Sequence, residues 1–96
     1  MMKKVDIQEV TRLINKLEEK FNALEINSEV VKGNVSKDLA KIKDELRRNP
    51  SEERIIESLK LFLNELRDYS YGNKNMNPMI YDLEEYIKKI DNTLDY

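Results

Sequence analysis

The chain has 96 residues, of which 38% are charged and 40% hydrophobic, and its formal net charge is −2. Because it contains no Cys and no His, it cannot form disulfides, bind zinc through thiolate or imidazole, or use either side chain in catalysis. Binding to nucleic acid normally requires a basic surplus, so we expect no nucleic-acid partner.

Two Gly, two Pro and periodic apolar residues are typical of a compact helical bundle, and no Asn-Gly or Asp-Gly hairpin turn occurs. We expect one helical domain over residues 1–96. No apolar segment follows the charged start, and no run is long enough to span a membrane. A cytoplasmic location is therefore expected, with membrane contact only through a protein partner.

The first helix is predicted to begin at Asp6, an N-cap with Glu9 three residues later. Val5 and Val10 occupy the two positions of a hydrophobic staple. The apolar face then contains Val10, Ile14, Leu17, Phe21 and Leu24, with Leu13 beside it.

The pattern loosens after this stretch, where Ser28 falls on the apolar face while Ile26 and Val30 point away from it. If the helix ends near Lys32, Gly33 is its C′ residue.

In that case a second helix spans residues 36–48, with Ser36 as its cap. Alternatively, one helix with a stutter continues to Arg48, which leaves three helices and a long first helix that forms a coiled-coil dimer. We favour the break at Gly33-Asn34, because a half-helix without cover would need a partner chain.

The central helix, residues 49–71, has the densest apolar face of the chain. Asn49 is predicted as N-cap, with Pro50 at the first helical position and Glu52 at N3. Its apolar stripe contains Ile55, Leu59, Phe62, Leu66 and Tyr69, flanked by Ile56 and Leu63. We expect this helix to pack against two or three neighbours in an all-α, antiparallel four-helix bundle.

The last helix repeats the Asn-Pro start, with Asn77 as cap, Pro78 at N1, and Met76 and Tyr81 as a staple. Its stripe contains Ile80, Leu83, Ile87, Ile90 and Leu94, with Met79 and Tyr86 beside it. Glu84–Lys88 and Glu85–Lys89 are predicted as i,i+4 pairs on its outer side.

The apolar faces of the first, central and last helices carry no charged residue, whereas a small helical enzyme needs inward-facing ionisable groups. We therefore expect no catalytic site and no cofactor. Acidic residues gather in sequence near residues 44–53, where solvated helix ends are expected, so no metal site is predicted. The acids in this range are Asp44, Glu45, Glu52 and Glu53, and Asp38 lies a short way before them.

Apolar residues outside the core stripes are the candidates for binding a partner, because Tyr and Met are favoured at interface centres. Leu61 on the central helix and Tyr81 on the last helix fall on the outer sides of their helices. Tyr81 is expected to form a patch with Tyr69, the last residue of the central stripe, and with Tyr71 and Met76 around the polar loop at residues 72–77. Ile26 and Val30 form a possible homodimer face.

With four helices in this length, the segment KIKDELRRNPSEERIIESLKLFL, the polar loop at YSYGNKN and the final amphipathic helix resemble the four-helix bacteriocin immunity proteins of Gram-positive bacteria. The resemblance lies in size and helix order. It implies a cytosolic bacterial protein that protects the toxin's producer. The C-terminal half, around Tyr71–Tyr86, would then recognise a toxin-bound membrane receptor.

We therefore predict a non-catalytic protein that binds another protein. The first alternative is an obligate homodimer, a structural or phage- or secretion-associated adaptor. The second is a small enzyme resembling the three-helix chorismate mutases, which would need cations such as Arg12, Lys41 and Arg67 in a shared cavity.

Overall fold

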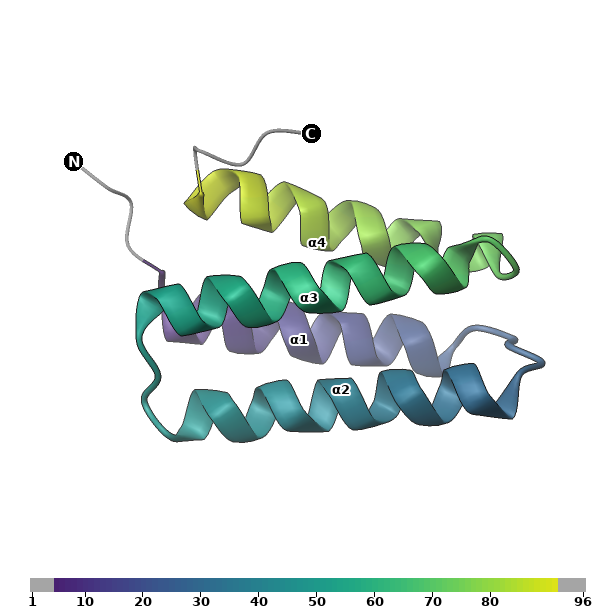
Figure 1. Ribbon diagram of the computed structural model, residues 1–96, viewed down its shortest axis with the longest axis horizontal. Helices are drawn as coiled ribbons and strands as arrows, with labels where there is room; N and C mark the ends of the chain where they lie inside the picture. The colour runs from purple at the N-terminus through teal and green to yellow at the C-terminus, as the bar shows by residue number, and fades with distance from the viewer. Residues whose placement is uncertain (1–4, 92–96) are drawn as a thin grey trace.

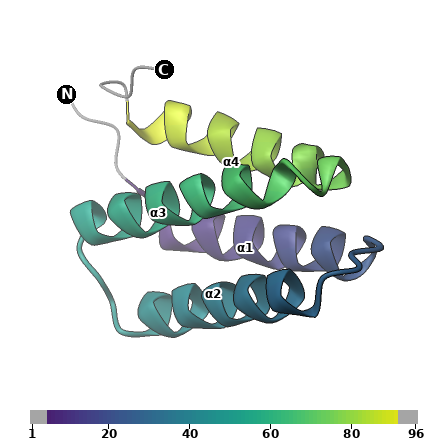
Figure 2. The same cartoon turned by 45° about the vertical axis from the view of Figure 1, so that its right-hand side comes forward.

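The computed structural model describes residues 5–91, which form four α-helices and one turn of 3-10 helix. The elements are α1 (Ile7–Asn22), α2 (Glu29–Arg47), α3 (Glu52–Ser70), η1 (Lys74–Met76) and α4 (Asn77–Ile90). Consecutive helices run in opposite directions and pack side by side, and α4 also packs against α1 (Figures 1 and 2). The predicted antiparallel four-helix bundle is confirmed, and the alternative with one long first helix is wrong.

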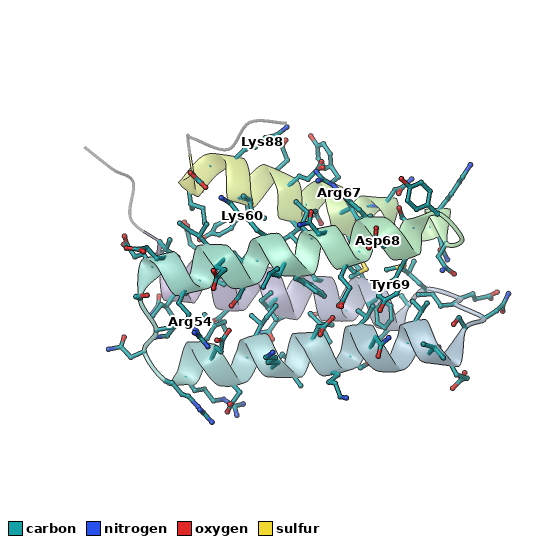
Figure 3. The ribbon with its side chains drawn as sticks, viewed as in Figure 1. Arg54, Lys60, Arg67, Asp68, Tyr69 and Lys88 are labelled. Atoms are coloured by element: carbon teal, nitrogen blue, oxygen red, sulfur yellow. The ribbon has the colours of Figure 1, made fainter. Side chains whose placement is uncertain are left out.

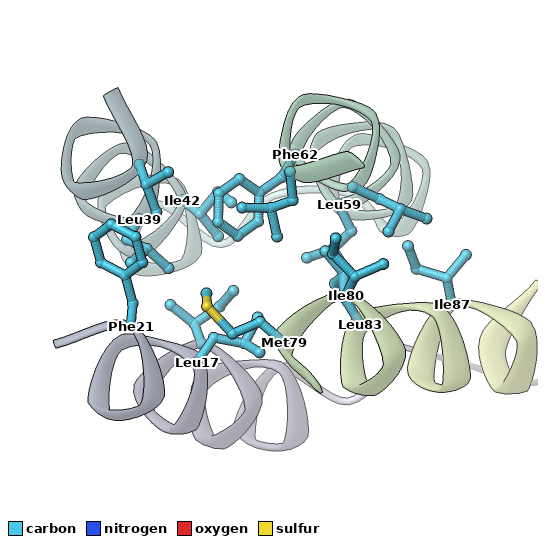
Figure 4. Close-up of a cluster of buried hydrophobic side chains, with 14 of the residues drawn as sticks. Leu17, Phe21, Leu39, Ile42, Leu59, Phe62, Met79, Ile80, Leu83 and Ile87 are labelled. Carbon is cyan, nitrogen blue, oxygen red and sulfur yellow. The ribbon is translucent and has the colours of Figure 1, made fainter. Parts of the chain in front are cut away.

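Apolar side chains from all four helices fill the space between them, and no polar or charged residue is buried as a whole within residues 5–91. Each large aliphatic or aromatic side chain in this core contributes roughly 1.5–3 kcal/mol before entropy is counted. Figure 4 shows how the helices contribute to one cluster. Its labelled residues are Leu17, Phe21, Leu39, Ile42, Leu59, Phe62, Met79, Ile80, Leu83 and Ile87.

The start of α1 follows the predicted pattern. Asp6 is the N-cap and its carboxylate accepts a hydrogen bond from the backbone N–H of Gln8 at 2.9 Å. Val5 packs partly against the core and Val10 is fully buried. The backbone N–H of Val5 also donates to Glu52 Oε2 at 3.2 Å, so the start of α1 is bonded to the start of α3.

The break between the first two helices lies earlier than predicted. Helix α1 ends at Asn22, and Ser28 caps α2 by accepting a hydrogen bond from the N–H of Val31 at 3.2 Å. The prediction of a break at Gly33-Asn34 with Ser36 as cap is therefore wrong, since these residues lie inside α2. The loop at residues 23–28 accounts for the shift in helical phase that resembled a stutter.

The corner between α2 and α3 also differs from the prediction. Asn49 is not a cap: its φ of 53° places it in the left-handed region, which Asn tolerates better than most residues. It reverses the chain after α2. Ser51 is the N-cap of α3 and accepts a hydrogen bond from the N–H of Arg54 at 3.2 Å.

The start of α4 is the third helix start that differs. The turn η1 leads directly into α4, so Asn77 is already helical and no side chain caps this end. Met76 is fully buried whereas 61% of Tyr81 is exposed, so the predicted staple between them is wrong. The predicted stripe residue Leu94 lies outside the described residues.

Candidate functional site

A hollow of about 300 Å³ lies between α2 and α3. Its lining from α2 consists of Asp38, Lys41, Ile42 and Glu45, and its lining from α3 consists of Ser58, Leu61, Phe62 and Glu65. We call this feature the α2/α3 groove. Figure 3 looks onto this side of the molecule, with Arg54 near one end of the seam between the two helices and Tyr69 near the other.

The spacing of the residues explains why both helices contribute to one groove. On α2 the polar lining residues recur at intervals of three and four, and on α3 Ser58, Leu61 and Glu65 recur at the same intervals. Residues spaced in this way lie along one stripe of a helix. Each stripe borders the buried residue that contributes to the floor, Ile42 on α2 and Phe62 on α3.

Hydrogen bonds join the two helices at both ends of the groove. At one end, Glu45 accepts from Ser58 Oγ at 2.7 Å and from Arg54 Nε at 2.9 Å. At the other end, Asn34 Nδ2 donates to Tyr69 Oη at 3.0 Å. The hydrogen bond from Ser58, assisted by the bond and charge of Arg54, lowers the pKa of the Glu45 carboxyl, although partial burial acts in the opposite direction.

Asp38 lies at the end of the groove lining opposite Glu45, one helical turn from Asn34, and has a different environment. Its Oδ2 atom is buried and has no hydrogen-bond partner among the residues that the structure describes. Burial raises the pKa of this carboxyl, while the positive charges of Lys41 and Lys37 oppose the increase. The groove lining therefore contains one bonded carboxylate at one end and, at the other end, a carboxylate with one oxygen that has no donor among the described residues.

The residues predicted to bind a partner are separated by the fold. Met76 is fully buried, and Tyr69 packs partly against the core. Tyr71 and Tyr81 remain 86% and 61% exposed. The predicted patch around residues 72–77 therefore loses Met76 to the core. Leu61 is 65% exposed and is the predicted residue that lines the groove.

The predicted dimer face is also divided. Ile26 retains only 6% exposure and belongs to the core, whereas Val30 is 69% exposed. Ile26 was expected on the outside because the helix was extrapolated through it, but it lies in the loop before α2. It is therefore not available as part of an exposed face.

The cations that an enzyme of the chorismate-mutase type would require lie in different surroundings. Lys41 lines the α2/α3 groove, whereas Arg67 forms an ion pair with Glu84 of α4. Arg12 is exposed on α1. Within residues 5–91 no group of three or more acidic side chains is arranged to hold a metal ion. The groove itself presents charged side chains beside apolar surface.

Sequence reasoning missed Lys41 and Glu65 as groove residues and treated Asp38 and Glu45 as solvated charges. The sequence did contain a signal for them. Each of these polar residues directly precedes a residue of the apolar stripe on its helix, so the polar residues recur with the same spacing as the stripe. That signal identifies a groove only when the neighbouring helix and its register are known.

Comparisons with protein-family models, with curated protein sequences and with solved structures give no match to this chain. Across residues 5–91, none of the helices combines the length and the apolar character needed to cross a membrane.

Proposed function

We propose that the protein acts by binding another protein and that the α2/α3 groove is its docking face. The observation that carries this proposal is Leu61, a large apolar side chain that is 65% exposed at the edge of a hollow. A single exposed hydrophobic residue is ordinary on a protein surface. Beside a groove whose floor is apolar, however, it offers a contact that a partner's side chain can cover.

The size and lining of the groove favour a protein segment as its occupant. Pockets for small molecules measure about 300–1,000 Å³ and enclose most of the ligand. The α2/α3 groove is at the lower limit of this range, with about 300 Å³. It extends along two antiparallel helices, and a groove of this kind accepts an amphipathic helix that inserts a few side chains. Binding of this kind requires no catalytic group.

We further propose that the biological role is bacteriocin immunity in the cytoplasm of a bacterium. This part of the proposal is supported by the size and helix order that the chain shares with immunity proteins. Tyr71 and Tyr81 lie in the segment through which such proteins recognise their receptor, and both are exposed. They provide a second contact region, and variants at these positions can be compared directly with variants at Leu61.

The experiment combines site-specific crosslinking with binding measurements on the identified partner. A photoreactive residue is placed at position 61 and, as a matched control, at position 30, because Val30 is similarly exposed on α2 outside the groove lining. The crosslinked protein is identified and purified. Its affinity is then measured by calorimetry for the wild type, Leu61→Arg and Val30→Arg.

We expect Leu61→Arg to weaken binding at least about tenfold, because the apolar contact is lost and the new guanidinium occupies the space of the partner's side chain. Val30→Arg should bind as the wild type does. Equal affinities for both variants would contradict the proposal that the groove is the docking face. Loss of binding in a Tyr71→Ala/Tyr81→Ala double variant alone would place the docking face near the end of α3 and the start of α4.

A further inference from the structure

The register of α2 and α3 places two carboxylates opposite each other. Two of the hydrogen bonds that join these helices are separated by eleven residues on both of them, as expected for a regular antiparallel pair. Four residues inward from the bonded pair Asn34 and Tyr69, the chain reaches Asp38 on α2 and Glu65 on α3. Both of these side chains line the groove.

The charges in the groove do not balance. Three carboxylates line it, those of Asp38, Glu45 and Glu65, against the single ammonium group of Lys41. Glu45 is already bonded to Ser58 and to an arginine of α3. Lys41, together with Lys37 nearby, acts on Asp38, so the groove lining as a whole keeps a negative excess to which Glu65 contributes. Because both facing carboxylates line the groove, a cation that donates hydrogen bonds can pair with both of them.

An arginine side chain matches this site better than a compact cation does. Its planar guanidinium carries five N–H donors, so it can bond to carboxylates on two walls at once. Its methylene groups can cover exposed apolar surface, which Leu61 provides at the rim. A volume of about 300 Å³ corresponds to roughly ten water molecules, enough for one such side chain.

We propose that the α2/α3 groove receives an arginine from a basic amphipathic helix of the partner protein. The guanidinium lies between Asp38 and Glu65, and the methylene groups lie against Leu61. This inference rests on the proposed function and deepens it, because it names the chemistry by which the partner is recognised. The carboxylates of the groove favour a cationic side chain, and Leu61 favours apolar surface next to that charge on the partner's helix.

The first test uses the wild-type protein and two small probes. N-acetyl-arginine methylamide and its neutral isostere N-acetyl-citrulline methylamide are titrated into the ¹⁵N-labelled protein, and backbone amide shifts are followed by NMR. We expect the arginine probe to shift amides at residues 38–45 and 58–65 in a saturable manner. The citrulline probe should bind about fivefold more weakly, the upper range for one exposed ion pair.

A pair of charge-matched double variants completes the test. Asp38→Asn/Glu65→Gln removes both facing carboxylates, whereas Asp44→Asn/Glu57→Gln removes one carboxylate from each helix outside the groove lining. The first variant should reduce the affinity for the arginine probe about fivefold, and the second should not. Equal binding of the two probes, or equal loss in the two variants, would overturn the inference, as would the absence of a saturable shift.

The same variants separate this inference from the proposed function. If Leu61→Arg loses the crosslinked partner while Asp38→Asn/Glu65→Gln binds it as tightly as the wild type does, the groove docks a protein without an arginine, and only the inference fails. If neither protein differs from the wild type, the groove is not the docking face and the proposed function fails. The probe comparison on the wild-type protein does not depend on the folding of any variant.

Discussion

Tyr86 on α4 is a residue whose surroundings leave its hydroxyl group without a hydrogen bond. Its side chain packs partly against the core, and its Oη atom is buried and has no partner among the described residues. Desolvation, together with the nearby carboxylates of Glu9 and Asp6, raises the pKa of Tyr86 to about 12, while the backbone of Asp6 acts in the opposite direction. The folded protein therefore holds this proton more tightly than the unfolded chain does.

Replacing Tyr86 with Phe should remove a loss of stability that the wild-type protein shows as the pH rises above 10. Between pH 10 and about 12 the unfolded chain has lost the Tyr86 proton and the folded chain keeps it, so the free energy of unfolding falls as pH rises. Urea unfolding of the wild type should show this fall, and Tyr86→Phe should lack it. At pH 7 the variant should be at least as stable, since it removes a buried hydroxyl without a partner.

The control for this prediction is Tyr81→Phe, because Tyr81 is 61% exposed and its hydroxyl is available to water. That variant should follow the wild type across the alkaline range. A tyrosinate absorbance step near pH 12 should disappear only in Tyr86→Phe. If both variants lose the same part of the pH dependence, the burial of Tyr86 does not produce it.

At the scale of the helices, the sequence predicted the four elements and the start of α1, but not where α2, α3 and α4 begin. The sequence Asn-Pro occurs before α3 and at the start of α4, and it suggested the same cap for both. In the structure Asn49 is left-handed after α2, whereas Asn77 is helical. The conformation of the Asn in each Asn-Pro pair depends on how sharply the chain must change direction there. That change of direction is set by the packing of the helices on either side.

The loop before α2 illustrates a second limit of helical periodicity. Ile26 is buried although it falls on the outer face of an extrapolated helix, because a loop residue follows no helical phase. Ser28 fell on the apolar face and is an N-cap. The exposure of Leu61 was predicted correctly from its phase. The groove beside it was not predictable, because it depends on the pairing and register of α2 and α3.

Gly33 provides a direct test of the continuous helix α2. It lies in the interior of this helix, is exposed, and has no heavy atom within 4 Å of the position that a Cβ would occupy. Gly33→Ala should therefore raise the free energy of unfolding by about 0.5–1 kcal/mol, because Ala loses less backbone entropy in a helix. Urea unfolding monitored by circular dichroism measures this difference.

The matched control is the reverse change at another exposed position of the same helix. Ala40→Gly should lower the free energy of unfolding by a similar amount, about 1 kcal/mol. A decrease in stability for Gly33→Ala would contradict the continuous helix, since Ala is unfavourable where a helix ends in the left-handed conformation.

At the scale of the whole molecule, ion pairs connect each pair of neighbouring helices around the bundle. Arg67 pairs with Glu84 between α3 and α4, and Lys20 pairs with Asp82 between α1 and α4. Lys43 of α2 pairs with Glu18 of α1, and Arg54 of α3 pairs with Glu45 of α2. Ion pairs at the protein surface contribute about 0–1 kcal/mol each. Their arrangement favours one order of helices, while the apolar interior provides most of the stability.

Within residues 5–91 the exposed large apolar residues lie on different elements. Val30 lies on α2, Leu61 on α3, Tyr71 directly after α3 and Tyr81 on α4. A stable homodimer buries about 1,200–2,000 Å² in total, with an apolar centre. Scattered single residues do not provide such a centre. We therefore expect the chain to be a monomer at micromolar concentration.

Ile26 and Val30 distinguish a monomer from a dimer built on the loop after α1. Because Ile26 is buried within one chain, Ile26→Ala should lower the free energy of unfolding by about 2–3 kcal/mol by leaving a cavity. Val30→Ala should stay within about 0.5 kcal/mol, since the side chain is 69% exposed. A dimer interface would instead make the melting temperature depend on protein concentration. Melting curves of both variants from 1 to 100 μM, together with sedimentation, decide between the two. A loss of stability that is confined to Ile26→Ala and independent of concentration follows from a core residue. Concentration-dependent melting, or equal losses in both variants, would indicate an interface between two chains.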